Sequence, residues 1–392
     1  MFQMELHLSP SFGRCSGHLN LSFKTGSCFL TDPYRWCEEN LEVETVRMGS
    51  RNREVKAYDS TTIARLRSKV EKGKILGKGY CHRAGRAVKA NIAAAAVSIV
   101  FIRGIRVGLL RRVEYGKSAE AAAEKLFEAE TSDNCLIIVD AGIATKKQFS
   151  AATTQRALLG RLRQNCKLRC EPPPPNGKRG CNPIHGPELH PGRAEPEVEP
   201  QEDFKVPGEH GEIRIRRWND LHFEEDCKKK LDLLRIDDPA YDRPLMTATT
   251  AQGELTNREF FQAYPHRWPV ETLFSIGEGT TAVETPRAWT EQAVKRRIGL
   301  GLMCGSLLKA IAAMGNGLAM GPWDLKPQPS AGRLANFLDI HLFNLLPIAL
   351  KGVVSRNCRK ILFASQTKDL SLDKAARFGK TRVRAAGYCQ NR

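Results

Sequence analysis

The sequence lacks three features that would place the chain in a secreted or membrane class. Its 12 Cys are scattered over 392 residues without a repeated spacing, which predicts reduced thiols instead of a disulfide framework. The first residues, MFQMELHLSP, have neither the basic nor the apolar region of a signal peptide. The most apolar runs, 91–102 and 298–308, are shorter than the roughly 18 residues of a membrane-spanning helix. We therefore expect a cytoplasmic protein without a membrane segment.

Acidic residues are scarce in two long blocks. Residues 51–170 contain 25 Lys and Arg against 10 Asp and Glu, and residues 301–392 contain 14 against 4. The other segments are close to neutral or slightly acidic, although the whole chain has a net charge of +18. Two basic blocks around a near-neutral middle indicate surfaces that meet a polyanion such as nucleic acid. A generally basic solubility surface is the alternative that charge alone leaves open.

Hydrophobic patterning predicts a series of strands and helices in the first basic block. The expected elements are a strand at 54–63 that carries Asp59, two strands within 91–113 with Gly104 and Gly108 as breaks, a helix at 117–130, a buried strand at 135–142 that includes Asp140, and a second helix at 145–165. This order predicts an α/β fold in which a mixed sheet is flanked by helices.

The second half of the chain begins with a change of composition. Residues 171–210 are rich in Pro and Glu and cannot bury enough apolar surface to become ordered, so they are expected to form a linker or extended insertion. Later elements are expected as strands at 212–218 and 243–251, the latter rejoining the main sheet, and helices at 255–264, 284–313 and 331–350. Thr256 and Glu259 have the spacing of a capping box for the first of these helices.

Three acidic residues could form a two-metal site for phosphoryl transfer. Asp59 and Asp140 lie near the ends of strands expected to be neighbours, and Glu271 follows the last expected strand on a helical segment. Carboxylates that converge in this way supply the hard oxygen ligands that divalent cations need. Each Asp taken alone is more often a turn or helix cap, and that interpretation stays open.

The motifs YDSTT, LIIVDAG and Tyr264-x2-Arg267-x3-Glu271 together resemble the DDE transposases of bacterial insertion sequences, in the branch with a Tyr-Arg-Glu-Lys signature. The resemblance covers about residues 51–320 and implies a ribonuclease-H-like core, a mixed sheet flanked by helices. It also implies an insertion between the second Asp and the Glu, which in this chain is Pro-rich and contains strands. A helical C-terminal region is expected after the core. The Lys of the signature falls at position 278, where this chain has Glu278.

The resemblance implies a role for each matching residue. Asp59, Asp140 and Glu271 would be the catalytic and metal-binding triad, with Mg²⁺ as cofactor and Mn²⁺ as a substitute. Tyr264 and Arg267 would contact DNA. The expected partners of the protein are the double-stranded element ends and the target DNA, which a homodimer would bind. The protein would be associated with the nucleoid. In place of the missing Lys, phosphate binding is expected from three residues of the next helix, Lys295, Arg296 and Arg297.

The expected domain limits follow from the resemblance and the composition. They are a short N-terminal segment at 1–50, a first core part at 51–170, a linker and insertion at 171–242, the remainder of the core at 243–320, and a basic, partly helical tail at 321–392.

Several alternatives stay open at this stage. Trp218, beside three Arg, could stack on a flipped base, although a core Trp is the commoner outcome. A zinc site from Cys166, Cys170, Cys181 and His185 fits poorly with their expected elements. The short segment before Asp59 also favours a second function, a catalytically inactive DNA-binding remnant or repressor of a related element. A general ribonuclease-H-like nuclease is a third.

Overall fold

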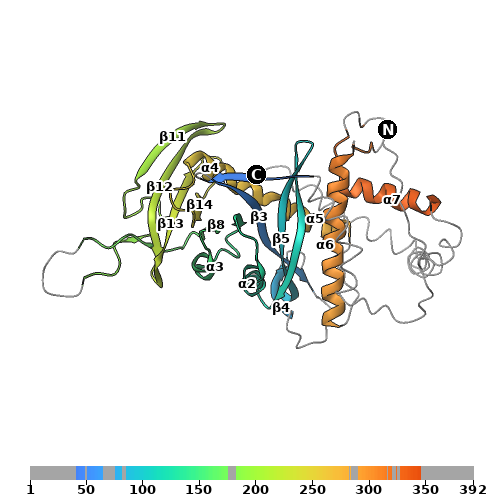
Figure 1. Cartoon of the computed structure of the whole chain (residues 1–392), viewed down its shortest axis with the longest axis horizontal. Coiled ribbons are helices and arrows are strands. Elements are labelled where there is room, and N and C mark those ends of the chain that lie inside the picture. Colours follow the sequence, from blue (N-terminus) through green and yellow to red (C-terminus); the bar gives the residue numbers. More distant parts are fainter. Residues whose placement is uncertain are drawn as a thin grey trace. The chain divides into compact units, whose positions relative to one another are not determined.

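The computed structural model describes residues 41–48, 51–64, 76–81, 85–174, 182–281, 283, 290–315, 317–319, 324 and 327–345. The chain divides into two compact units, Met1–Asn316 and Gly317–Arg392, and each is described by itself. The first unit contains a large sheet and the helices that cover it (Figure 1). The finer domain limits expected within each unit stay predictions.

The centre of the sheet combines antiparallel and parallel pairing. Its strands are β3 (Arg51–Ala64), β5 (Arg86–Ile102), β6 (Ile105–Gly116), β7 (Cys135–Val139) and β8 (Arg156–Arg161). They lie in the order β6, β5, β3, β7, β8, with β5 antiparallel to both of its neighbours and β7 parallel to β3 and β8. This topology is compatible with the ribonuclease-H-like core that the sequence led us to expect.

Local sequence explains the first hairpin and confirms the two strands expected within 91–113. Arg103 and Gly104 both have positive φ, 48° and 82°, which is the conformation of a tight two-residue turn between antiparallel strands. Gly108, expected as a break, lies inside β6 instead. Ser306 of α6 (Glu291–Met314) accepts from the Leu110 N–H at 3.1 Å and donates to the Gly108 carbonyl at 2.9 Å, which satisfies two buried backbone groups of β6.

Side chains of β3 alternate between two hydrophobic clusters, one on each face of the sheet. Val55 and Ala57 belong to a cluster that includes residues of α5 (Trp268–Gly279) and α6. Tyr58 faces the other cluster, where α2 (Ala119–Ala129) packs and the Tyr58 and Phe127 rings lie 5.2 Å apart. Helices therefore cover both faces, as a sheet with buried central strands requires.

Residues 202–237 extend the same sheet beyond β8. The strand β14 (Leu245–Thr249) pairs with β8 on one side, as expected for a strand that rejoins the sheet, and with β13 (Asp226–Asp237) on the other. The strands β12 (Gly211–Phe223) and β11 (Glu202–Gly208) then follow outward. In Figure 1 these strands stand at the opposite end of the first unit from α6.

Two expectations from the sequence were wrong. Residues 145–165 do not form one helix, because α3 (Lys146–Ala151) ends early and β8 follows, with Leu158 and Leu159 buried between neighbouring strands. A short apolar run gives the same pattern in a buried strand and in a helix. The polar residues of β11 are also ordered, because backbone pairing with β12 replaces the missing apolar burial.

Short elements complete the description of the first unit. They are β1 (Glu42–Val43), β2 (Thr45–Met48), β4 (Leu76–Cys81), β9 (Leu168–Arg169), β10 (Glu188–Leu189), α4 (Asn257–Ala263) and the 3-10 helix η1 (Tyr264–Arg267). The predicted capping box is confirmed at α4, where Thr256 accepts from the Glu259 N–H and Glu259 accepts from the Thr256 N–H.

Two long helices lie toward the C-terminus. Within the described residues, α6 is a helix long and apolar enough to cross a membrane by length and composition, with a mean hydropathy of 1.4. Its Val294, Ile298 and Leu302 are buried in the core beside α5, which is the ordinary reason for such composition in a core helix. In the second unit, α7 (Ala331–Leu345) confirms the helix expected to begin at 331; residues 346–350 lie outside the described residues.

Candidate functional site

The parallel pairing of β3 and β7 brings the two predicted Asp residues together. Tyr58 and Val139 are partners in this pairing, so the residues that follow them, Asp59 and Asp140, lie at the same level of neighbouring strands. Asp59 is part of β3, whereas Asp140 comes directly after β7. Residues separated by 81 positions thus share one edge of the parallel part of the sheet.

The helical segment after β14 brings Glu271 to these two Asp residues through Arg267. One nitrogen of the Arg267 guanidinium, Nη1, donates to Asp59 Oδ2 at 3.1 Å. The other, Nη2, lies 2.5 Å from Glu271 Oε1, one turn further along α5. A planar guanidinium can hold two carboxylates in this way because its donors form a rigid fork.

Tyr264 completes the group from the start of η1. Its hydroxyl donates to Asp140 Oδ1 at 3.0 Å, and the Arg267 guanidinium lies 5.6 Å from the centre of its ring. The structure therefore joins all five residues of the predicted constellation, Asp59, Asp140, Tyr264, Arg267 and Glu271, by direct contacts.

Two prolines explain the local backbone between α4 and α5. Pro265 is at the start of η1 and Pro269 at the start of α5, positions where the missing N–H of proline costs no helical hydrogen bond. The chain can therefore end α4, form one tight turn and begin α5 within a few residues. This turn places Tyr264 and Arg267 within contact of Asp140 and Asp59.

Asp59 has a raised proton affinity at this site. Burial raises the pKa of Asp59 to about 6, against the opposing effects of its hydrogen bond from the Ser60 N–H and of Arg267, while Asp140 and Glu271 raise it further. Three carboxylates and one guanidinium leave the site with an excess of negative charge when all are ionised. Such a site attracts cations, and a perturbed carboxyl in this setting is typical of functional sites.

The carboxylate oxygens of this site fit a divalent cation chemically, although Tyr264 and Arg267 contact them in this structure. Within the described residues, no group of three His, Cys, Asp or Glu side chains is arranged to hold a metal ion. Tyr264 occupies an oxygen of Asp140, and Arg267 occupies oxygens of Asp59 and Glu271. The three carboxylates supply the hard oxygens that Mg²⁺ prefers, with charge that a cation would neutralise.

The sequence did not predict Arg161 at this edge, nor the contact that Glu278 makes there. Arg161 Nη1, at the end of β8, lies 3.9 Å from Asp140 Oδ1. Its position could not be predicted while residues 145–165 were expected to form a helix. The available signal was a basic residue at the end of a second apolar run, after the apolar run at 135–139. Glu278 accepts from the Thr61 hydroxyl at 3.1 Å, and Thr61 is two residues beyond Asp59 on the same face of β3.

The three basic residues expected to replace the missing Lys lie near the start of α6. Lys295 pairs with Glu291 at 2.7 Å, and its ammonium group lies 5.9 Å from the Tyr115 ring centre. Arg296 is half-buried and Arg297 is exposed. Their role in phosphate binding stays a prediction.

Trp218 is a core residue in the structure. Its side chain is fully buried in β12, and its ring N–H donates to the Val198 carbonyl at 3.0 Å. A ring that is enclosed and hydrogen-bonded in this way cannot stack on a flipped base without leaving the core. The base-stacking hypothesis was therefore wrong, and the core alternative agrees with the structure.

The zinc alternative gains no support. Cys166 and Cys170 are free thiols, and the ring of His185 lies against that of His222 with Nδ1 and Nε2 2.9 Å apart. Cys181 lies outside the described residues.

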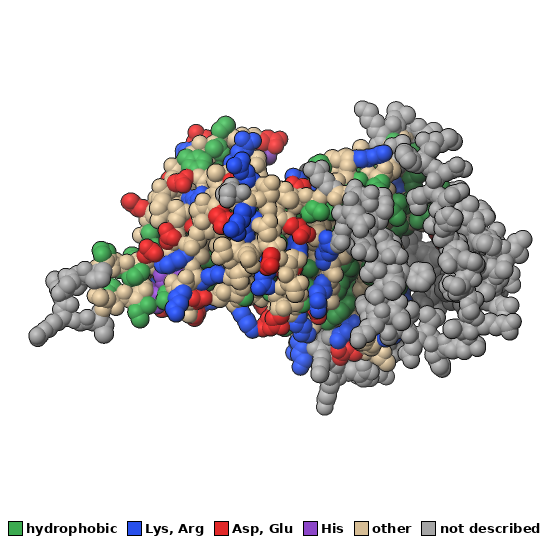
Figure 2. Space-filling view, viewed as in Figure 1, with side chains coloured by type: hydrophobic (Ala, Val, Ile, Leu, Met, Phe, Trp, Pro, Cys, Tyr) green, Lys and Arg blue, Asp and Glu red, His purple; other side chains and the backbone are tan. Residues whose placement is uncertain are grey.

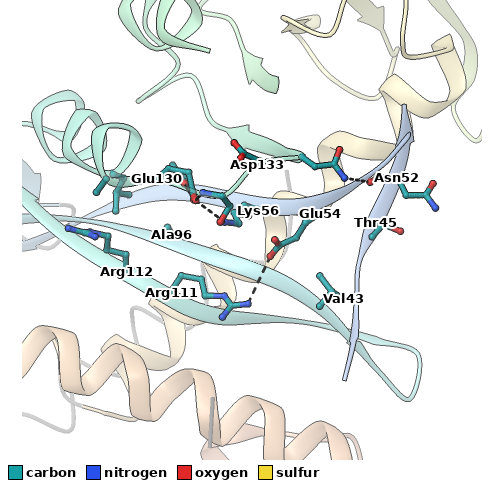
Figure 3. A pocket seen from close by; sticks show the side chains of 15 residues that line it. Val43, Thr45, Asn52, Glu54, Lys56, Ala96, Arg111, Arg112, Glu130 and Asp133 are labelled. Atoms are coloured by element: carbon teal, nitrogen blue, oxygen red, sulfur yellow. Dashed lines mark hydrogen bonds and ion pairs between the residues drawn. The ribbon is translucent and has the colours of Figure 1, made fainter. Parts of the chain in front are cut away.

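A cavity of about 680 Å³ lies on the opposite face of β3 from the carboxylates (Figure 3). Lys56 donates to Glu130 at 3.0 Å, and Arg111 lies 4.0 Å from Glu54. Tyr58 also donates to Glu130, at 2.5 Å. Because Lys56 and Arg111 are paired with Glu130 and Glu54, this cavity offers less attraction to an ionic ligand than the carboxylate site does.

Comparisons with known proteins add distant structural likeness. No protein-family model and no curated protein sequence matches the chain. A solved structure, the cryo-EM structure of a piggyBac transposase synaptic complex with hairpin DNA, is similar over 78% of this chain with 9% identity and a TM-score of 0.35. The similarity spans 56% of the piggyBac chain. A likeness at this level supports no conclusion about function, so any functional proposal has to rest on the geometry of the site.

Proposed function

We propose that the chain is a DNA transposase that cleaves phosphodiester bonds at insertion-sequence ends and joins the freed 3′-hydroxyl to target DNA. The supporting observation is the gathering of Asp59, Asp140 and Glu271 at one sheet edge, with Tyr264 and Arg267 linking them. Folded proteins seldom bring three partly buried acids together, because the charges repel one another. A catalytic requirement for a cation explains this cost.

Each residue of the constellation has a role in this proposal. Asp59, Asp140 and Glu271 would hold Mg²⁺, or Mn²⁺ as its substitute, which when bound activates the attacking oxygen and stabilises the leaving oxygen. Tyr264 orients Asp140 through its hydroxyl. Arg267 presents the fork that holds two carboxylates here, and the same fork is suited to the oxygens of a DNA phosphate.

A second candidate is the catalytically inactive DNA-binding remnant or repressor. It is favoured by Glu278, which places a fourth acid beside Thr61 where the signature has Lys. An added negative charge near a phosphate-binding site opposes the approach of DNA. Binding without cleavage is the behaviour that this candidate predicts.

The test is a nicking assay on supercoiled DNA that carries the flanking ends, with Mg²⁺ or Mn²⁺ and with DNA binding measured in parallel. We expect specific 3′-end nicks from the wild-type protein. Asp59→Asn, Asp140→Asn and Glu271→Gln should each lower the nicking rate more than about 100-fold, beyond the loss of an outer-shell partner. The control is Asp133→Asn, an exposed residue before β7.

Each outcome decides between the candidates. Nicking that survives in any one of the three variants would remove that residue from the triad. Sequence-specific binding of wild-type protein without nicks would establish the inactive remnant, and neither binding nor nicking would refute both. The homodimer on DNA remains a prediction that gradient sedimentation of the protein–DNA complex would test. The location in the cytoplasm remains a prediction that cell fractionation would test.

A further inference from the structure

A two-stranded ribbon extends the sheet beyond the end of β3. The last pair between β3 and β5 joins Ala64 to Ala90, but β5 begins earlier, at Arg86. There β5 pairs with β4, in a register that joins Leu76 to Asn91 and Cys81 to Arg86. We call β4 and residues 86–89 the basic ribbon; Figure 1 shows it at the end of β5 away from the β5–β6 turn.

One face of the basic ribbon continues the face of the sheet that carries Asp59. Asp59 pairs with Ala95, and every second residue of β5 shares its face, which leads through Ala93 and Asn91 to Lys89. Lys89 pairs with Lys78 of β4, so Lys78 lies on that face too. Lys89 is at most about 20 Å from Ala95 along the strand.

The other face of the basic ribbon packs closely against the protein. A Cβ on Gly77 would lie 1.9 Å from the Lys117 carbonyl oxygen, and a Cβ on Gly79 would lie 2.1 Å from the Thr62 side chain. Glycine is therefore needed at both positions for the ribbon to pack on this side. Its outward direction is fixed by this packing, and the two Lys face solvent.

The outward face carries uncompensated positive charge. Lys78 and Lys89 are exposed and directly opposite each other, and neither makes an ion pair with a carboxylate of the described residues. Like charges at such a position destabilise a strand pair. Tyr80, on the same face, is 57% exposed. Figure 2 shows Lys and Arg side chains at the lower margin of the molecule, where Figure 1 labels β4.

We propose that the basic ribbon binds the phosphates of duplex DNA beside the scissile bond, an inference that rests on the proposed function. A polyanion removes the repulsion between Lys78 and Lys89 that the free protein has to tolerate. A two-stranded ribbon also has the width that the major groove of DNA admits. At about 3.4 Å per base pair, a reach of about 20 Å places these contacts about six base pairs from the bond that is cleaved.

The experiment compares Lys78→Gln/Lys89→Gln with a control that removes the same charge elsewhere, Lys205→Gln/Lys228→Gln. Lys205 and Lys228 are exposed residues of β11 and β13. Binding of a labelled duplex is measured by anisotropy over a range of salt concentrations. Two lost phosphate contacts should lower the slope of log K against log salt by about 2 and weaken binding about 60-fold at 0.1 M salt. The control should change neither.

Two further measurements locate the contact and protect the test from misfolding. Lys78→Arg/Lys89→Arg keeps the charge and should restore both slope and affinity. Tyr80 pairs with Ala87, which is two residues further from Ala95 than Lys89, so a photo-crosslinking residue in place of Tyr80 should label DNA about eight base pairs from the nick.

Slopes equal to the control, or labelling remote from the nick, would refute the role of the basic ribbon even if the protein nicks DNA. Absence of binding by the wild type would instead refute the proposed function. Loss of binding in the Gln variant without rescue by Arg would also refute the ribbon, because charge would then not be the cause.

Discussion

The ionised carboxyl of Asp59 should lower the stability of the metal-free protein, and this can be measured. Its pKa is raised to about 6 from a usual value of 3.8, first by burial and also by Asp140 and Glu271. The 3.1 Å contact with Arg267 offsets only part of this. At neutral pH the folded protein therefore keeps a charge on Asp59 that an unfolded chain would hold at lower cost.

The sign of the pH effect follows from the two proton affinities. The folded state binds a proton on Asp59 more tightly than the unfolded state, so stability falls as pH rises from about 4 to about 6. The gap between 3.8 and about 6 corresponds to about 3 kcal/mol, reached above pH 6 or so. Below about pH 4 the carboxyl is neutral in both states and the cost disappears.

The substitution Asp59→Asn removes the charge and keeps the shape. The Asn carbonyl can still accept from the Ser60 N–H, but the amide nitrogen that replaces Oδ2 cannot accept from Arg267, so one hydrogen bond is lost. Subtracting the cost of that bond, we expect the variant to have a free energy of unfolding about 1 to 2 kcal/mol higher than wild type at pH about 7.5, and no higher at pH about 4. The assay is urea unfolding followed by far-UV circular dichroism without divalent cations.

The matched control is Asp133→Asn, which neutralises an exposed carboxylate. Its effect should be close to zero at both pH values, because exposed charges contribute little. If Asp59→Asn changes stability equally at both pH values, or lowers it near neutrality, the electrostatic account of the site is wrong.

Two other substitutions test neighbouring groups. Tyr264→Phe removes the hydroxyl that donates to Asp140 and should reduce nicking about 10-fold at subsaturating Mg²⁺, with less effect as the metal concentration rises; an unchanged rate would deny Tyr264 an orienting role. His266 has a pKa lowered to about 4 by burial and by Arg106, although Glu44 lies 3.8 Å from its ring. Its contribution to stability is therefore lost as pH falls from about 6.5 through 4, and His266→Gln should reduce that loss by up to about 3 kcal/mol; a pH dependence equal to wild type would contradict this.

The sequence predicts the site better than it predicts the sheet around it. Asp140 could be located because it follows a strongly apolar run, and Asp59 because it lies in an alternating pattern that continues into β-branched residues; such patterns are read locally. The contacts of Tyr264 and Arg267 with these acids could not be derived from the sequence. They join residues more than 100 positions apart and depend on how α4, η1 and β14 pack against the strands that carry the acids.

The errors share one physical cause, which is that strand pairing is decided by distant partners. The run containing Leu158 and Leu159 could be a helix or a strand until β7 and β14 are known to flank it. The residues of β11 are too polar to order themselves and become a strand only beside β12. Arg161 was missed with β8, because its place near Asp140 exists only when 156–161 is a strand.

The continuity of the sheet through β14 has a consequence for shortened versions of the protein. Removing residues 171–242 would delete β11, β12 and β13 and leave β14 with one open side. Four of the five residues of β14 are buried, so the new edge would be apolar and ready to pair with another copy. The present outer strand, β11, contains three charged residues and Pro207. The insertion thus protects the chain from aggregation, and a minimal core would need a redesigned edge to stay soluble.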